Sequence, residues 1–129
     1  MPVDGRARDT IGREIVRLCS EYYGRGPTRA RTYSTGDVIV VVLEETFTPA
    51  EKTLIARGEA ESIQDIRRRF QRAMADEFTA VVERATGRQV RSFLSETDLE
   101  NDISVELFIL APVPGDGDGS EPGGEPAGP

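Results

Sequence analysis

Apolar residues recur every three or four positions in two stretches of the chain, the spacing of one face of an α-helix. The first stretch holds Ile11, Ile15, Leu18 and Tyr22, and the second holds Ile63, Ile66, Phe70, Met74, Phe78, Val81 and Ala85. This pattern predicts a helix from about Asp9 to Gly24 and a long helix over about 59–86, each ended by a glycine.

Four shorter stretches have the composition of β-strands, and turn residues separate them in pairs. Residues 29–34 and 38–44 flank a tight turn at Gly36, and residues 89–97 and 103–110 flank an acidic turn. Between the pairs, Thr48-Pro49-Ala50-Glu51 has the pattern of a helix capping box. It predicts a short helix that ends or bends at Gly58.

These elements define an α+β protein of order α-β-β-α-α-β-β. We expect a four-stranded, mostly antiparallel sheet with the helices packed on one face. The length of 129 residues suits one domain. We assign it to residues 9–111, between a flexible N-terminal arm (1–8) and a disordered, acidic, Gly/Pro-rich tail (112–129).

Two features predict a homodimer or larger assembly. The long helix would measure roughly 40 Å, whereas seven-residue strands span only about 23 Å. We also expect an apolar patch on the face of the sheet that points away from the helices. The central strands have apolar residues at both odd and even positions, so both faces carry apolar side chains. With Ile103, Val105, Leu107 and Ile109 facing the helices, that patch would hold Ile39, Val41, Leu43, Phe108 and Leu110.

Composition and charge disfavour several classes of function. The net charge of −7 disfavours nucleic acid as a partner, since phosphates call for a basic surface. No apolar run approaches the ~20 residues of a membrane span, so we expect no direct membrane insertion. A single cysteine and no apolar stretch after the N-terminal charges favour a cytoplasmic protein.

The residues that most catalytic and metal sites require are missing. The chain has no histidine and one cysteine, and it lacks both the phosphate-binding loop and the dinucleotide fingerprint. We therefore expect no catalytic residue, no cofactor and no metal, and a protein that is not an enzyme.

The acidic turn with Glu96, Asp98, Glu100 and Asp102 could offer oxygens to Mg²⁺ or Ca²⁺. It lacks the glycine and the distal glutamate of a calcium loop, and a solvated hairpin turn is the favoured interpretation.

Two segments are candidate partner-binding sites. Arg68, Arg69 and Arg72 share a face of the long helix and could bind an anion or an acidic partner. A solvated face, paired with neighbouring acids, is the interpretation we favour for them. The turn Arg25-Gly26-Pro27 is rigid and bent, and it serves either as a binding loop or only as a helix-to-strand turn.

Several of these segments together resemble the MpsC family. They are the first helix with Tyr23-Gly24-Arg25-Gly26-Pro27, the strand 38–43, the segment Phe47–Leu54 with its capping box, the Arg-rich helix, and Thr86-Gly87-Arg88-Gln89-Val90. The resemblance implies an accessory protein of a cation-translocating, membrane-potential-generating system linked to inorganic carbon uptake. It also implies a membrane transport component as partner. A different interpretation is a nucleic-acid-binding module, because the element order is also that of type II KH and BolA-like domains.

Overall fold

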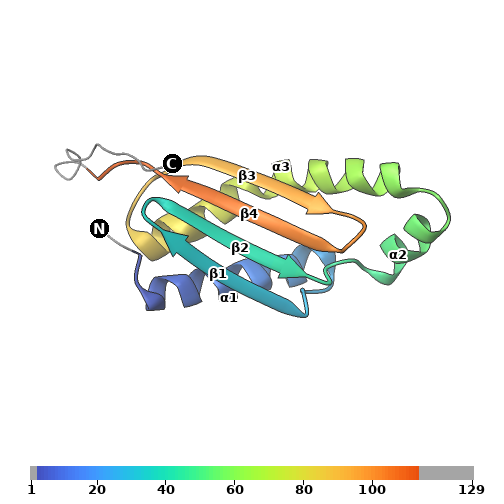
Figure 1. Cartoon of the computed structure of the whole chain (residues 1–129), viewed down its shortest axis with the longest axis horizontal. Helices are drawn as coiled ribbons and strands as arrows, with labels where there is room; N and C mark the ends of the chain where they lie inside the picture. Colours follow the sequence, from blue (N-terminus) through green and yellow to red (C-terminus); the bar gives the residue numbers. More distant parts are fainter. Residues whose placement is uncertain (1–2, 114–129) are drawn as a thin grey trace.

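The computed structural model describes residues 3–113 and contains three helices and four strands. In chain order they are α1 (Gly5–Tyr23), β1 (Arg29–Thr35), β2 (Val38–Glu44), α2 (Pro49–Ala56), α3 (Ala60–Thr86), β3 (Val90–Asp98) and β4 (Ile103–Leu110). The order α-β-β-α-α-β-β and the α+β class are as predicted, and α3 is the one long helix (Figure 1). From residue 114 on, the predicted tail lies outside the described residues.

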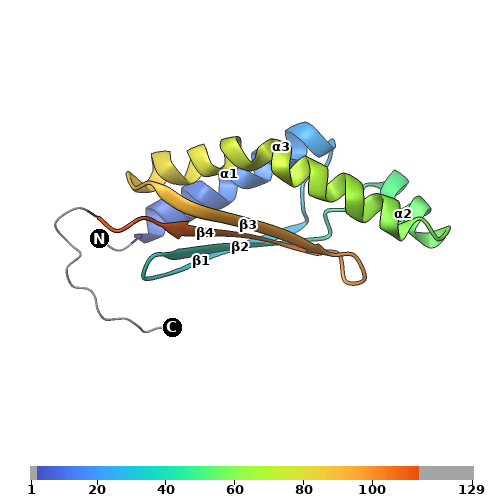
Figure 2. The same ribbon diagram turned by 90° about the horizontal axis from the view of Figure 1, so that it is seen from above.

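All strand pairings in the sheet are antiparallel, in the order β1-β2-β4-β3. The hairpins β1–β2 and β3–β4 therefore meet along β2 and β4, and β1 and β3 form the edges. Helices α1 and α3 lie side by side on one face of this sheet (Figure 2). The protein is a two-layer structure, and no described element covers the other face.

The core lies between the sheet and the two long helices, and it reverses the predicted orientation of the central strands. Ile39, Val41 and Leu43 on β2, and Phe108 and Leu110 on β4, face the helices and are buried. The prediction that these residues form the outer patch was wrong. Their neighbours Val38, Val40, Val42, Ile103, Val105, Leu107 and Ile109 lie on the open side and are half-buried.

The reason for this error is that β2 and β4 are apolar at both parities, so the alternation of polar residues does not identify the inner face. In β4 the inner parity includes Ser104 and Glu106, which are buried beside the helices. The outer parity is wholly apolar. An apolar patch does exist on the open face, but it is made of the opposite residues.

Helix α1 begins at Gly5, four residues before the predicted start at Asp9. Asp4 is its N-cap, and its Oδ1 accepts a hydrogen bond from the backbone N–H of Ala7 at 2.8 Å. Asp4 and Asp9 are equally suitable cap residues, and no helix-breaking residue after Gly5 separates them. Part of the segment expected as a loose arm is therefore helical.

The N-terminal part of α3 projects past the sheet, as its length predicts, but α2 covers it (Figure 1). Ile63 is buried there, whereas Ile66 is 53% exposed. The buried position next to Ile66 belongs instead to Arg67. The length of α3 is thus no reason for a second copy of the chain, and the case for self-association rests on the open face of the sheet.

The capping box of α2 is confirmed and gives a stability prediction. Thr48 Oγ1 accepts from the Glu51 backbone N–H at 3.1 Å, and Glu51 Oε1 accepts from the Thr48 N–H at 2.9 Å. Thr48→Ala should lower the free energy of unfolding by about 1 kcal/mol in urea titrations. Thr53→Ala in the middle of the same helix is the control and should be close to neutral; equal effects would exclude a special role for the cap.

Candidate functional site

Arg67 on α3 is the centre of the polar structure beneath the helices. Its side chain is only 2% exposed. The guanidinium carbon lies 4.2 Å from the centre of the Tyr23 ring and 5.1 Å from that of Phe47. Aromatic faces attract a cation, so these rings partly replace the water that Arg67 has lost.

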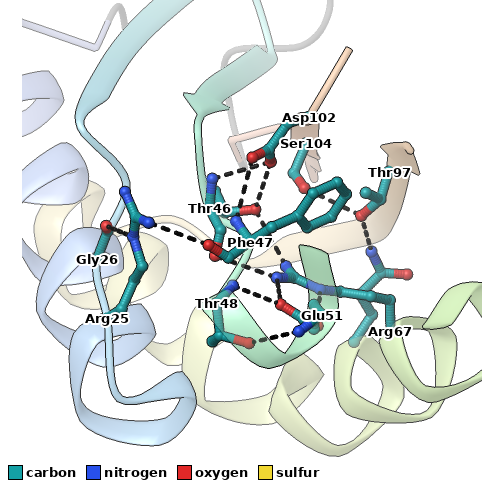
Figure 3. Close-up of polar contacts among 11 residues, drawn as sticks. Arg25, Gly26, Thr46, Phe47, Thr48, Glu51, Arg67, Thr97, Asp102 and Ser104 are labelled. Carbon is teal, nitrogen blue, oxygen red and sulfur yellow. Dashed lines mark hydrogen bonds and ion pairs between the residues drawn. The ribbon is translucent and has the colours of Figure 1, made fainter. Parts of the chain in front are cut away.

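Four hydrogen bonds fix the Arg67 guanidinium (Figure 3). Nε and Nη2 donate to the two carboxylate oxygens of Glu51 at 2.8 and 2.6 Å, and Nη1 and Nη2 donate to Oγ1 and O of Thr46, both at 3.2 Å. Burial alone would raise the pKa of Glu51, but the hydrogen bonds from Arg67 and from Thr48 outweigh it and hold that pKa below its usual value. Glu51 therefore caps α2 and neutralises Arg67 with the same carboxylate.

Asp102 extends this cluster to the turn between β3 and β4. Its carboxylate accepts from the Thr46 N–H at 2.9 Å, from the Thr46 hydroxyl at 3.1 Å and from the Phe47 N–H at 3.2 Å. Asp98, on the other side of the turn, accepts from the Glu100 N–H and from the Asn101 amide. Asp98 and Asp102 thus bind protein donors. Within residues 3–113 no three acidic or thiol side chains form a group suited to a metal ion.

A second buried polar row crosses from α3 to β3 and β4. Gln71 Nε2 donates to Thr97 Oγ1 at 2.9 Å, and Thr97 Oγ1 lies 3.0 Å from Ser104 Oγ. Beside this row is a cavity of about 10 Å³, lined in part by Gln71, Ser104 and Glu106. That volume is enough for about one water molecule.

Glu106 is an ionisable group in the middle of the core. It is 4% exposed, and its Oε1 has no hydrogen-bond partner among the described residues. Burial raises the pKa of this carboxyl to about 8, against the opposing effects of the Ser95 hydroxyl and the Arg67 charge. Glu106 is therefore mostly protonated at pH 7.

The predicted basic cluster of α3 is divided by the structure. Arg68 and Arg72 line a groove of about 320 Å³ between α3 and the edge strand β3, together with Gln71, Ala75, Phe93, Ser95 and Glu96. Neither forms an ion pair within the described part of the chain. Arg69 lies outside the groove and pairs with Asp65 at 3.1 Å, where both side chains are exposed. The groove and the Arg69 surface are thus separate features.

The turn Arg25-Gly26-Pro27 packs against the loop after β2. Arg25 Nη1 donates to the Phe47 carbonyl at 3.1 Å (Figure 3). A Cβ atom on Gly26 would lie 2.3 Å from Ser20 Oγ, so any larger residue there would require the Ser20 hydroxyl to move. The rigid geometry expected of this turn therefore has a packing reason, because the turn joins the end of α1 to the loop that carries Thr46 and Phe47.

Sequence reasoning missed the three residues that organise the interior: Arg67, Asp102 and Glu106. We predicted a solvated turn around Asp102 and no role for Arg67. A signal for Glu106 was present, since it is the only charged residue in β4. No comparable signal marks Arg67, because its partners come from residues 46–51 and from α1.

The open face of the sheet is the largest apolar feature not covered by any described element. We define it as Tyr33 on β1, Val38, Val40 and Val42 on β2, Leu94 on β3, and Ile103, Val105, Leu107 and Ile109 on β4. Tyr33 is 53% exposed and Leu94 is 60% exposed. A contiguous apolar patch of this kind commonly marks a protein interaction surface.

These features define an α+β protein with a two-layer fold and an uncovered apolar sheet face. The chain belongs to the family described as the Na⁺-translocating membrane potential-generating system (MpsC), whose pattern matches residues 4–112. The match includes the residues before Asp9 that α1 contains. Neither a curated protein nor a solved structure gives a significant match to the chain. Within residues 3–113, no helix has the length and hydropathy needed to cross a bilayer.

The buried ion pair gives the first prediction from this site. Arg67→Met would leave the Glu51 carboxylate without its cationic partner, and removal of one member of a buried pair costs about 3–5 kcal/mol. We expect a loss of this size in the free energy of unfolding measured with urea. Arg69→Met, which removes an exposed pair about half a turn from Arg67 on the other side of α3, should change it by about 0.5 kcal/mol or less. Similar effects from both would contradict the role given to Arg67.

Glu106 gives a pH-dependent prediction. The folded state holds the proton up to a pKa of about 8, whereas an unfolded glutamate releases it near 4.3. The wild-type protein should therefore lose stability as the pH rises from about 4 to 8. The stability gain of Glu106→Gln over wild type, measured by melting temperature, should be small at pH 5 and larger at pH 7 and 9.

The other titratable groups facing Glu106 do not obscure this test. They are Arg67 from α3, and Cys19 and Tyr23 from α1. Burial raises the pKa of Cys19 to about 12 and also raises that of Tyr23, so both stay neutral through the range. The hydrogen bonds from Arg67 and Thr48 lower the pKa of Glu51, which moves its titration away from the pH values of the test. If the stabilities of wild type and Glu106→Gln changed in parallel with pH, the prediction that burial raises the pKa of Glu106 would be wrong.

Proposed function

We propose that the protein is a non-enzymatic accessory module of a Na⁺-translocating, membrane-potential-generating system, working by assembly with itself and with a component of that system. The family membership supports the system. The open face supports the proposed mode of action, which is assembly through protein contacts. It is an apolar surface on a domain whose core lies on the other face of the sheet.

The polar residues of the described chain support a binding role over a catalytic one. Arg67, Glu51 and Asp102 are engaged with one another or with backbone groups in holding the fold together. Glu106 is buried and faces a cavity with room for about one water, too small for a substrate. The groove with Arg68 and Arg72 offers positive charge and shape, without a nucleophile next to a base.

Nucleic-acid binding has no comparable support. A type II KH domain grips the phosphate backbone with a Gly-x-x-Gly loop between its two helices. The corresponding junction here, between α2 and α3, reads Arg57-Gly58-Glu59 and has one glycine followed by an acid. The net charge of −7 points in the same direction. A salt-dependent RNA-binding assay would separate the two functions.

A charge in the middle of the open face tests the proposal. Val40 lies between Tyr33 and Leu107 on this face. Val40→Glu should leave the circular dichroism spectrum and the fold intact but abolish self-association in sedimentation experiments. In cells that lack the native gene, it should also fail to restore the Na⁺-dependent membrane potential.

The matched control is Ile66→Glu, an equally apolar-to-acidic change at an exposed position on the helical side. It should associate and restore the potential as wild type does. Full activity of Val40→Glu in cells would refute the proposed role of the open face. Val41→Glu would be unsuitable, because Val41, which the sequence placed in the outer patch, is buried in the core.

A further inference from the structure

The open face has an ordered charge pattern that the strand register makes visible. Residues paired across the sheet form four levels along the strands. Each level is written in the sheet order β1, β2, β4, β3. From one end of the strands to the other, the levels are Arg29–Glu44–Ile103–Asp98, Arg31–Val42–Val105–Glu96, Tyr33–Val40–Leu107–Leu94 and Thr35–Val38–Ile109–Ser92. Basic residues thus lie on the β1 edge, and acidic residues lie at the same levels on the β3 edge.

We infer that two copies of the chain pack face to face through this surface, about a two-fold axis that runs parallel to the strands between β2 and β4. This inference rests on the proposed self-association and specifies its geometry. The axis places β1 of one copy over β3 of the other and β2 over β4, at unchanged levels.

In this arrangement opposite charges or apolar side chains face each other at nearly every position. The exception is Glu44, which lies opposite the partner's Ile103 and keeps its ion pair with Arg31 of its own chain at 2.7 Å. Arg29 and Arg31 lie opposite the partner's Asp98 and the partner's Glu96. Tyr33 and Val40 lie opposite the partner's Leu94 and the partner's Leu107. At the far end, the small polar residues Thr35 and Ser92 meet. Opposite charges therefore pair at the rim and apolar side chains meet at the centre, which is the usual anatomy of a stable interface.

The other face-to-face arrangement, with the axis across the strands, brings the first level over the fourth. Arg31 would then lie over the partner's Tyr33, and Glu96 over the partner's Leu94. Glu96, which forms no ion pair in the described chain, would be buried against an apolar group without a counter-charge, which is costly. Arg31 would keep its own pair with Glu44. The charge pattern therefore selects the parallel axis.

The area of the face is in the range that this arrangement needs. Four strands at about 4.8 Å spacing and about 23 Å in length give a projected area of roughly 440 Å². Side-chain relief raises the accessible area above the projection, toward the roughly 800 Å² per partner of a standard interface. Two sheets packed in this way lie about 10 Å apart and rotated by about 30°, as in a β-sandwich.

Arg31 and Glu96 lie opposite each other across the interface, so exchanging their charges gives a direct test. Arg31 also pairs with Glu44 of its own chain at 2.7 Å, and the loss of this pair is common to the homodimer and the heterodimer of the variant. In homodimers, Arg31→Glu places an acid opposite the partner's Glu96, and Glu96→Arg places a base opposite the partner's Arg31. Each variant should dimerise about tenfold more weakly than wild type in sedimentation equilibrium. A mixture of the two should form a heterodimer of nearly wild-type affinity, because opposite charges then meet at both rims.

The heterodimer is measured by native mass spectrometry of an equimolar mixture in which one variant carries a mass label. A heterodimer fraction well above the statistical half supports the parallel axis. A statistical fraction from variants that still dimerise would overturn this axis and leave self-association intact. A wild-type chain that stays monomeric at high concentration would overturn both, and would assign the open face to a different protein.

Discussion

The buried ion pair between Arg67 and Glu51 is the interaction on which most of the structure depends. An arginine that is 2% exposed is tolerated only if its charge and its N–H groups are satisfied. Here the partners come from the N-terminus of α2, from the loop after β2 and from the aromatic ring of Tyr23 at the end of α1. Because Asp102 holds that same loop through Thr46, the pair also fixes the β3–β4 turn. One guanidinium thereby joins elements from the whole length of the domain.

This arrangement explains why a chain with a modest core keeps so many polar groups inside. The helix-facing side of the sheet is apolar near one end, where Phe108 and Leu110 pack against α1 and α3. Toward the other end it becomes polar, with Ser104, Thr97 and Glu106 beneath Arg67 and Gln71. The interior is thus divided into a hydrophobic half and a hydrogen-bonded half. The second half specifies how α2 and the loops close over the end of the sheet.

The open face has the opposite character, and the two faces of the sheet have different roles. The inner face contains polar residues with specific partners, whereas the outer face has an apolar centre and charges only toward one end. A surface with this composition is suited to a protein partner that excludes water.

The sequence by itself determined the order of elements, the capping box of α2 and the family, because these depend on local spacing and on residue types that act on near neighbours. The 3.6-residue period defined α3, and Thr48 and Glu51 cap a helix whatever surrounds them. Only the tertiary structure decided which face of β2 and β4 is the core, since both parities are apolar and the choice depends on where α1 and α3 pack. It also decided that Arg67 is buried while Arg68 and Arg72 border a groove. Adjacent arginines on one helix have the same local chemistry, and distant residues such as Glu51 and Tyr23 determine which of them leaves the solvent.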